Sequence, residues 1–327
     1  MIVTPALADA NNGNWQTARR WAEMLDGEYR VRLTRRWDAA EGADDALMIA
    51  LHARRSAASI AAWRGGGPRR PLAVVLTGTD LYRDIEADAE AEQSLELADA
   101  LVVLNELGGE RLPPRVRAKC HVVLQSCPVP PHGVPTEGGR VSFRTVVMVG
   151  HLREEKDPRT FFRAVARLAH RTDLRFEHLG AALDPALGRE AAALAASQPS
   201  YRWLGGLPHE ATLAHIGRAD VLVHASRMEG GAHVVIEAAR SGTPVLASRI
   251  DGNVGLLGAD YGGYFPVGDD AALAALIERS CDDPAMLLGL RRQVMARAPR
   301  FAPEAEAAAL RRLVAALLER PLPEIRA

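Results

Sequence analysis

Short apolar runs alternate with segments of helical periodicity along almost the whole chain, and this alternation limits the fold more than any other feature. Pro71–Leu76 and Ala100–Leu104 have the length and composition of buried strands, and the segment Ala89–Ala98 between them has a helical pattern. Strands that alternate with helices form parallel sheets with helices on their faces. The sequence therefore predicts an α/β protein built from parallel sheets.

The expected strands and helices follow from this pattern. Strands are expected at Ile2–Ala6, Tyr29–Leu33, Ala46–Leu51, Pro71–Leu76, Ala100–Leu104, His121–Leu124, Thr145–Gly150, Leu174–Gly180, Tyr201–Gly205, Ala219–His224 and Pro244–Ser248. The segment Gly262–Val267 is expected to precede a helix. Helices are expected at Gln16–Leu25, from the cap Ser56 to Trp63, at Ala89–Ala98, Phe161–Ala169 and Glu210–Ile216, from about Ala232 to Gly242, from about Asp270, and at Pro303–Leu318. The segment Ile250–Gly255 is expected to form a glycine loop, and the acidic series Asp84, Glu86, Asp88 and Glu90 a solvated surface.

A segment rich in proline and glycine, Pro128–Gly139, divides the chain, and its composition is that of a linker. The length of 327 residues is too great for one ordinary core. We therefore expect a first domain at residues 1–127, a linker at 128–140, a second domain at 141–302 and a final helical segment at 303–327.

The charge balance excludes some classes of partner. Forty basic and 41 acidic side chains nearly cancel, which argues against a nucleic-acid or anionic-membrane surface. No apolar run reaches the roughly 18 residues of a membrane-spanning helix, and no signal peptide is evident. The three cysteines, Cys120, Cys127 and Cys281, have no metal-ligand spacing. We expect a cytoplasmic protein with reduced cysteines and no metal cofactor.

The stretch Arg227–Ala238 carries the strongest functional signal. It follows the apolar run Ala219–His224, and Gly230–Gly231 allows the backbone to turn sharply and to approach a ligand closely. A helical pattern begins at about Ala232, so free backbone N–H groups lie at a helix N-terminus, where an anion is favoured.

Glu229 and Glu237 lie before and after this turn. A carboxylate only accepts hydrogen bonds, so it suits the hydroxyls of a sugar or a ribose. An anion cradle between two such carboxylates predicts a nucleotide-sugar site, whereas the simpler alternative is an ordinary turn with two solvated glutamates. The expected donor-binding residues are Gly230, Gly231, Ala232, His233 and Glu237.

Polar and basic residues follow several strands of the first half. The loop Asn11–Asn14, with Gly13 in it, tolerates positive φ and can meet a donor diphosphate or an acceptor, or it is a plain connection in which Asn14 caps the next helix. Arg54 and Arg55 precede a helix N-terminus, where helix dipole and guanidinium groups together favour an anion; solvated arginines are the alternative. Asp80 can bind a sugar hydroxyl, act as a base or cap a helix. The expected acceptor-binding residues are Asn11, Asn12, Asn14, Arg19, His52, Arg54, Arg55, Thr77, Gly78, Thr79, Asp80 and Arg83, while Gly13 is expected at the donor.

The stretch from Arg227 to Ala247, in which Gly242 and Pro244 separate a helix from a strand, resembles the donor-site signature of the retaining glycosyltransferases of family 4. The resemblance implies the GT-B fold, with two Rossmann-like parallel-sheet domains facing across a cleft and a final helix that crosses back to the first domain. In this family the first glutamate of the pair contacts the transferred sugar and the second holds the ribose. Those roles fall to Glu229 and Glu237.

The resemblance also assigns basic residues to the donor diphosphate. The family has a basic residue directly after the glycine of the strand at Thr145–Gly150 and a lysine a few positions later. Lys156 is in place, but His151 stands where arginine is usual, so either Arg153 substitutes or the donor pocket differs. The implied catalytic residues are Glu229, Lys156, Arg153 and His151, and cationic side chains take the place of a metal.

Segments of the first half, among them Asn11–Ala18, Leu51–Ser56 and Leu76–Asp84, look like one branch of this family, the selenosugar synthases. That resemblance implies transfer of the sugar of UDP-N-acetylglucosamine to selenophosphate, with release of UDP and phosphate. It also implies a functional link to a selenophosphate-producing enzyme and to a downstream selenoneine synthase. Two alternatives remain: a hexosyltransferase that acts on a hydroxyl acceptor with His52 or Asp80 as base, and a non-catalytic UDP-sugar-binding protein.

Overall fold

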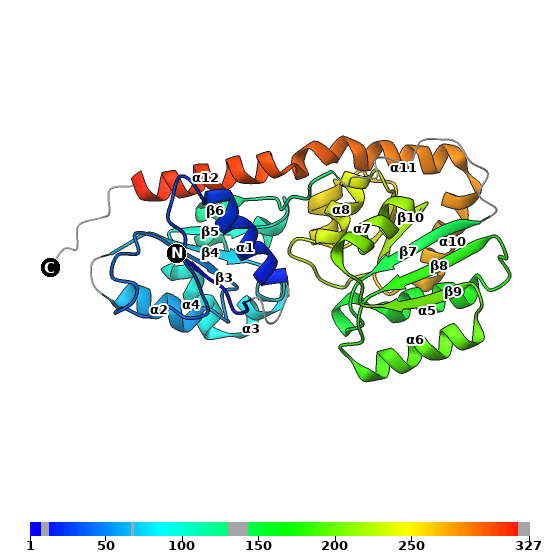
Figure 1. Cartoon of the computed structure of the whole chain (residues 1–327), viewed down its shortest axis with the longest axis horizontal. Coiled ribbons are helices and arrows are strands. Elements are labelled where there is room, and N and C mark those ends of the chain that lie inside the picture. Colours follow the sequence, from blue (N-terminus) through cyan, green and yellow to red (C-terminus); the bar gives the residue numbers. More distant parts are fainter. Residues whose placement is uncertain (8–12, 67–68, 130–142, 320–327) are drawn as a thin grey trace. The chain divides into compact units, whose positions relative to one another are not determined.

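The computed structural model describes residues 1–7, 13–66, 69–129 and 143–319, which divide into two compact units (Figure 1). The first unit consists of Met1–Gln125, Glu229–Gly231 and Pro303–Ala327, and the second of Ser126–Met228 and Ala232–Ala302. The beginning of the chain, its end and the Glu229–Gly231 turn therefore share one unit. Residues 130–140, most of the expected linker, lie outside the described residues.

A parallel sheet of six strands forms the centre of the first unit, in the order β2-β1-β3-β4-β5-β6. The strands are β1 (Ile2–Val3), β2 (Leu33–Thr34), β3 (Met48–Leu51), β4 (Leu72–Leu76), β5 (Ala100–Val103) and β6 (Cys120–Val122). Every residue of β3, β4 and β5 is buried, because helices cover both faces of a parallel sheet.

Alternate residues of these strands enter two separate cores. On one face Met48, Ala50 and Val74 pack with Ile60 and Trp63 of a helix. The helices of this unit are α1 (Gly13–Leu25), α2 (Ala57–Gly65), α3 (Ile85–Ala87), α4 (Ala89–Leu97), the π-helix η1 (Asp80–Asp84), the 3₁₀ helices η2 (Gly108–Arg111) and η3 (Pro114–Lys119), and α12 (Pro303–Glu319). The period of two along each strand places successive side chains on opposite faces.

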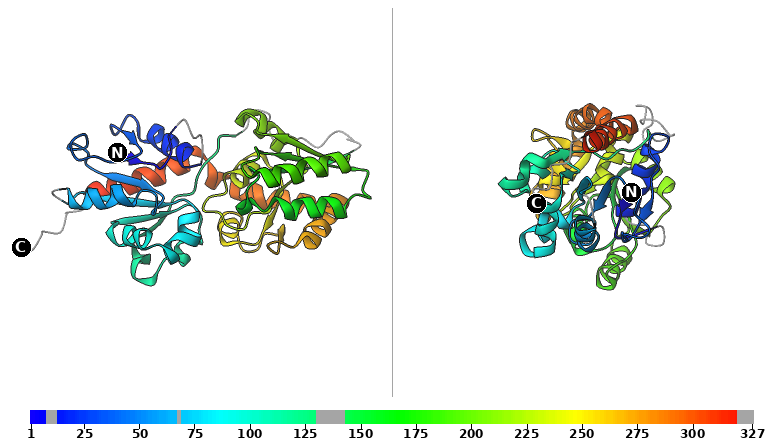
Figure 2. Two further views of the ribbon diagram at one scale, coloured as in Figure 1. Left: turned by 90° about the horizontal axis from the view of Figure 1, so that it is seen from below. Right: turned by 90° about the vertical axis from the view of Figure 1, so that its left-hand side faces the viewer.

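The second face of this sheet is covered by α1 and α12, which lie side by side (Figures 1 and 2). Trp21 of α1 and Leu310 of α12 are fully buried in the core of this face. Glu306 of α12 is buried as well, and it accepts hydrogen bonds from Trp21 Nε1 at 2.6 Å and from Arg20 Nε at 2.9 Å. The two bonds satisfy a carboxylate that would otherwise be costly to bury.

A second parallel sheet of six strands forms the centre of the other unit, in the order β12-β11-β10-β7-β8-β9. The strands are β7 (Arg144–Val149), β8 (Leu174–Leu179), β9 (Tyr201–Gly205), β10 (Val221–His224), β11 (Val245–Ser248) and β12 (Tyr264–Phe265). The helices are η4 (Glu154–Lys156), α5 (Pro158–Arg167), α6 (Pro185–Ser197), α7 (His209–Arg218), α8 (His233–Ser241), α9 (Asp251–Leu257), α10 (Asp270–Asp282), α11 (Pro284–Arg297) and η5 (Ala298–Phe301). Two parallel sheets covered by helices confirm the predicted α/β class.

Three of the expectations for the first unit are wrong. The predicted strand at Tyr29–Leu33 is shifted to β2, because only Leu33 and Thr34 pair with β1. Asn14 does not cap the first helix, because α1 begins at Gly13 and contains it. Asp84 also departs from the expected solvated acidic surface: it is buried, and arginines hold it, as described below.

One expectation for the second unit is wrong as well. The predicted glycine loop at Ile250–Gly255 is mostly helical, as α9. Glycine lowers helix propensity, but the buried Asn253 of this helix donates from Nδ2 to the backbone oxygen of Ser248 at 2.9 Å. Tertiary contacts of this kind override local propensity.

No helix within the described ranges is long and apolar enough to cross a membrane. Within the same ranges, no group of three or more histidine, cysteine, aspartate or glutamate residues is placed to hold a metal ion.

Candidate functional site

The loop after β7 carries the basic residues predicted to bind the diphosphate. His151 and Arg153 are exposed, and Lys156 ends the short helix η4. The Cγ and Cδ atoms of Lys156 lie 3.5 Å from the place that a Cβ of Gly150 would take, so its aliphatic stem packs over this glycine. The structure thus brings three predicted residues together in one loop at the carboxyl end of a strand, where α/β sheets bind ligands.

His151 has a defined tautomer in this loop. Its Nδ1 accepts a hydrogen bond from the Ala181 backbone N–H at 3.0 Å. The neutral ring therefore carries its proton on Nε2, which can donate to an anion. Desolvation by the surrounding loops, and then the positive charges of Arg153 and Lys156, lower the pKa of His151 below its ordinary value. Near neutral pH this residue offers a hydrogen bond rather than a positive charge.

Arg227, which follows β10, connects the loop after β10 to the loop after β7. Its backbone N–H donates to the Glu155 oxygen at 2.9 Å, and its guanidinium lies 3.3 Å from Oδ2 of Asp157. Asp157 is buried, and its backbone has the left-handed conformation, with φ of 46°. It accepts a hydrogen bond from the Thr160 hydroxyl at 2.8 Å. Since β10 pairs with β7, these contacts join the loops of two neighbouring strands.

Glu237 lies in the second turn of α8, the helix that follows the Gly230–Gly231 turn. Its Oε1 accepts from His209 Nε2 at 2.7 Å and faces His233 Nδ1 at 3.0 Å. Burial alone would raise the pKa of Glu237, but the bonds from His209 and His233 prevail and lower it to about 2. The carboxylate is therefore ionised at neutral pH, as the predicted hydroxyl acceptor must be.

The Glu229–Gly231 turn packs in the first unit. The carbonyl oxygen of Gly230 accepts a hydrogen bond from Asn105 Nδ2 at 2.8 Å. A Cβ on Gly230 would lie 2.5 Å from the carbonyl carbon and oxygen of Thr77, and one on Gly231 would lie 2.9 Å from the Gln125 side chain. Gly230 is thus required by the close approach of protein backbone, and Gly231 has side chains close to it; the sequence did not reveal these neighbours. Ala232 is buried and precedes α8.

His52 is the first residue after β3 and is almost fully buried, with the unusual positive φ of 72°. Its Nε2 lies 3.2 Å from the Thr79 hydroxyl. Burial, the largest effect, lowers the pKa of His52; Asp80 and Asp84 oppose this effect, and Arg54 and Arg55 reinforce it. The ring is therefore neutral at physiological pH and faces the loop after β4.

Asp80 does not offer its carboxylate to a ligand in this structure, because it has no exposed surface. Its Oδ1 accepts from the backbone N–H groups of Thr77 at 2.9 Å and Gly78 at 2.8 Å, and its Oδ2 from that of Ala53 at 3.0 Å. The predicted acceptor contact and the predicted helix cap are both replaced by this role, in which Asp80 fixes the loops after β3 and β4 together.

The predicted arginine cluster is present, but a buried carboxylate organises it. Asp84 lies 3.1 Å from Arg54 Nε through Oδ2 and 3.1 Å from Arg83 Nε through Oδ1. Arg54 and Arg83 are about half exposed, and Arg55 is exposed beside them. Arg54 Nη1 also lies 4.0 Å from Oδ2 of Asp88, so the carboxylates of Asp84 and Asp88 both face this cluster, and the exposed Arg55 adds a further positive charge.

The predicted residues of the first loop are not gathered at this cluster in the same way. Asn11 and Asn12 lie outside the described residues. Gly13 and Asn14 form the start of α1, and Arg19 pairs with Glu23 one turn later, at 2.8 Å on an exposed face. An exposed pair of this kind contributes little and leaves Arg19 able to exchange partners.

Sequence reasoning missed His209 and the roles of Asp84 and Asp157. His209 begins α7 directly after Pro208, and nothing in the sequence relates it to Glu237, which lies on another helix. Asp84 was visible only as one member of an acidic series. The spacing between a loop and a distant helix is set by the tertiary fold, so no local pattern reports it.

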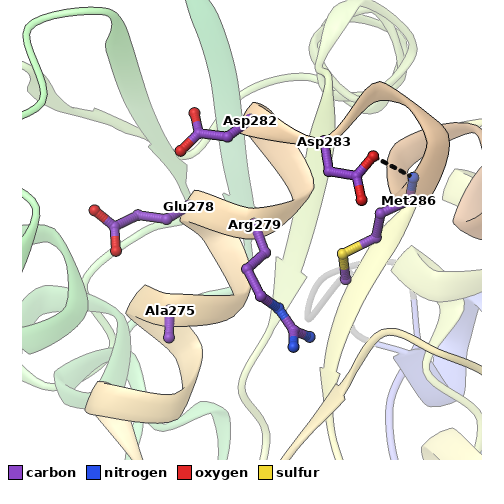
Figure 3. A pocket seen from close by; sticks show the side chains of 6 residues that line it. All are labelled: Ala275, Glu278, Arg279, Asp282, Asp283 and Met286. Atoms are coloured by element: carbon purple, nitrogen blue, oxygen red, sulfur yellow. Dashed lines mark hydrogen bonds between the residues drawn. The ribbon is translucent and has the colours of Figure 1, made fainter.

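A shallow groove elsewhere in the second unit is lined only by residues of α10 and the start of α11 (Figure 3): Ala275, Glu278, Arg279, Asp282, Asp283 and Met286. Asp283 there accepts a hydrogen bond from the Met286 backbone N–H and so caps α11. None of the predicted site residues lines this groove, and we assign it no part in the chemistry.

The two sheets and the loops at their carboxyl ends define a glycosyltransferase of the GT-B fold. Residues 138–300 match the model of the family described as "Glycosyl transferases group 1", and this half of the chain belongs to that family. Glycogen synthase of Mycobacterium tuberculosis (strain CDC 1551 / Oshkosh) is 38% identical over 85 residues, which are 26% of this chain and 20% of that protein. The match thus spans one fifth of the length of the curated relative.

Solved structures share the fold over most of the chain. Sucrose-phosphate synthase from Thermosynechococcus elongatus has a TM-score of 0.69 at 21% identity, over 85% of this chain and 75% of that one. The pneumococcal O-GlcNAc transferase GtfA, solved with UDP and GlcNAc, has a TM-score of 0.67 at 18% identity, over 84% and 57%. Anabaena HepE, solved with UDP and glucose, has a TM-score of 0.67 at 15% identity, over 83% and 78%.

Proposed function

We propose that this protein is a selenosugar synthase, which transfers the sugar of UDP-N-acetylglucosamine to selenophosphate and releases UDP and phosphate. The observation that carries the proposal is the burial of both candidate bases beside an arginine cluster. His52 is 2% exposed and Asp80 has no exposed surface, whereas Arg54, Arg55 and Arg83 are exposed. A hydroxyl acceptor needs a base within hydrogen-bond reach. A multiply charged, strongly nucleophilic anion needs cations instead.

The donor half of the proposal rests on the second unit. Lys156, Arg153 and the Nε2–H of His151 would bind the diphosphate, and the ionised Glu237 would accept hydrogen bonds from the ribose. Glu229 would contact the transferred sugar. Two structural neighbours, GtfA and HepE, were solved with UDP, which supports a UDP-linked donor here.

The acceptor half rests on the loops after β3 and β4. Selenophosphate carries several negative charges, and guanidinium groups bind phosphate oxygens in a bidentate manner. Asp84 would hold Arg54 and Arg83 in place, while Arg55, which makes no ion pair with another described residue, supplies a further positive charge. A neutral, buried His52 adds no charge of its own.

The reaction balances in two stages. Selenium attacks the anomeric carbon, the bond from that carbon to the diphosphate oxygen breaks, and UDP leaves with the bonding electron pair. Water then cleaves the selenium–phosphorus bond, so phosphate is released and the selenium stays on the sugar. Lys156 and its neighbours would stabilise the charge that develops on the departing diphosphate, and we propose that no metal takes part.

The test mixes purified protein with UDP-N-acetylglucosamine and selenophosphate and follows UDP, phosphate and sugars by mass spectrometry. We expect one UDP and one phosphate for each selenium-containing sugar, with the same yield in EDTA. UDP release without a selenium-containing sugar would overturn the proposal in favour of another acceptor. Donor binding without any turnover would indicate a UDP-sugar-binding protein.

A further inference from the structure

Two imidazoles contact the same oxygen of Glu237. His209 comes from the first turn of α7 and His233 from the first turn of α8, and these helices pack against each other (Figure 1). Both bonds end on Oε1, at 2.7 Å from His209 Nε2 and 3.0 Å from His233 Nδ1. Among the described residues, Oε2 makes no hydrogen bond and no ion pair.

His233 lies between two hydrogen-bond acceptors. Its Nε2 lies 3.1 Å from the backbone oxygen of Ser126, which can only accept a hydrogen bond. Its Nδ1 lies 3.0 Å from Oε1 of Glu237. The two contacts hold the ring in place beside this oxygen before any ligand binds.

The burial of the three residues is unequal. The side chain of Glu237 is 7% exposed, that of His233 34% and that of His209 64%. A glutamate has three rotatable bonds, and ordering such a side chain costs conformational entropy. Fixing it before a ligand arrives removes that cost from binding. The exposed position of His209 means that it contributes little to the core.

We propose that Glu237 divides its carboxylate between two tasks: His209 and His233 hold Oε1, so that Oε2 is presented to the vicinal hydroxyls of a nucleotide ribose. This inference rests on the proposed function, because it takes the ligand to be a uridine diphosphate. The two histidines are positioning residues, since they act on the ribose only through Glu237.

The experiment measures the binding of two probes by isothermal titration calorimetry, UDP and 2′,3′-dideoxyuridine 5′-diphosphate, which lacks the ribose hydroxyls. We expect His209→Ala to weaken UDP binding about tenfold, the effect of losing one hydrogen bond to a charged group. The dideoxy probe should bind the variant and the parent equally. His209→Gln, whose amide can still donate to Oε1, should recover most of the affinity for UDP.

His215→Ala is the matched control. His215 lies on the same helix, α7, and its Nδ1 makes an equally short contact, 2.7 Å, with Oε2 of Glu177. Its loss should leave the binding of both probes unchanged. In a Glu237→Gln background, moreover, His209→Ala should have little further effect, because the group through which it acts has changed.

The outcomes separate the inference from the proposed function. A parent protein that fails to bind UDP overturns both. A parent that binds UDP while His209→Ala leaves UDP affinity unchanged overturns the inference alone, and so does an equal loss for both probes. His209→Gln that behaves like His209→Ala would also contradict a role through hydrogen bonding.

Discussion

Gly180 touches Gly150 so closely that a Cβ on Gly180 would lie 1.9 Å from the Gly150 carbonyl oxygen and 2.4 Å from its carbonyl carbon. Gly180 also has φ of +151°, which L side chains rarely adopt. The contact joins the end of β8 to the start of the loop that carries His151 and Lys156. The position of that loop therefore depends on the absence of a side chain on the neighbouring strand.

Gly180→Ala should destabilise the protein by more than about 2 kcal/mol, since the methyl group has no room and the backbone is strained. It should also weaken UDP binding, because the Gly150–His151 peptide must move. Urea unfolding and calorimetry measure the two effects. The matched control is Gly289→Ala in α11, where a Cβ meets nothing within 4 Å; it should stabilise the protein by up to about 1 kcal/mol. Equal stability of the two variants would contradict the steric account.

Glu229→Ala should lower kcat at least about 100-fold while UDP affinity changes less than about threefold. The expected reason is that Glu229 contacts the transferred sugar, whereas Lys156 and Glu237 hold the nucleotide. Steady-state kinetics with UDP-N-acetylglucosamine and a UDP titration separate the two quantities. Near-normal turnover in this variant would reject the role of Glu229.

Lys156→Met keeps an aliphatic stem over Gly150 and removes the ammonium group. We expect kcat/KM to fall about 100-fold, because the proposed role of the lysine is to stabilise the departing diphosphate with its positive charge. Lys119, the other lysine of the chain, provides the control: its Nζ donates to backbone oxygens of Leu95 and Glu96, so Lys119→Met should keep its activity. A similar loss in both variants would mean that the effect is general.

The stability contributed by Glu237 should depend on pH. In the unfolded chain this carboxyl titrates near 4.5, and in the folded protein its pKa is about 2. Its contribution is therefore fully present above the unfolded value and is lost as the pH falls from 4.5 towards 2. A second contribution is lost at higher pH. The bond to Glu237 raises the pKa of His209 against a smaller opposing effect of burial. The stability contributed by this contact is therefore lost as the pH rises through the folded pKa of the histidine.

Urea unfolding of the parent and of Glu237→Gln across this range tests the expectation. The difference in unfolding free energy should be on the order of 3 kcal/mol near neutral pH and should shrink below pH 4.5. Glu23→Gln, which removes only the exposed partner of Arg19, should change stability by less than about 0.5 kcal/mol. A constant difference for Glu237→Gln down to acid pH would contradict the ion-pair account.

The strands were the most predictable part of the molecule, since the central ones are continuous apolar runs such as Leu72–Leu76 that fit no other place than a buried sheet. The Glu-turn-Glu signature and Lys156 were also visible, because their signal is local. What could not be predicted depends on contacts between distant segments. Asp80 has the composition of a ligand-binding residue, yet three backbone N–H groups from two loops occupy its carboxylate.

At Gly230, too, the sequence signal is local while its structural cause lies in a distant segment. A Gly-Gly turn before a helix is typical of an anion-binding site, and this interpretation uses only residues that are adjacent in the sequence. The closest atoms to a Cβ there belong to Thr77, which is far away in the sequence. A glycine in such a turn thus indicates that another group lies close to the backbone, but the sequence does not identify that group.

The hydrogen bonds from Trp21 and Arg20 to Glu306 join the first helix to the last one, and this affects the order of folding during synthesis. During synthesis the second sheet is complete before Pro303 leaves the ribosome, whereas the first sheet still lacks α12, one of the two helices in the core that contains Val75 and Val102. The half that is translated first therefore finishes folding last. Until α12 has emerged, part of an apolar sheet face stays open to water, and this nascent intermediate is the one that we expect chaperones to bind.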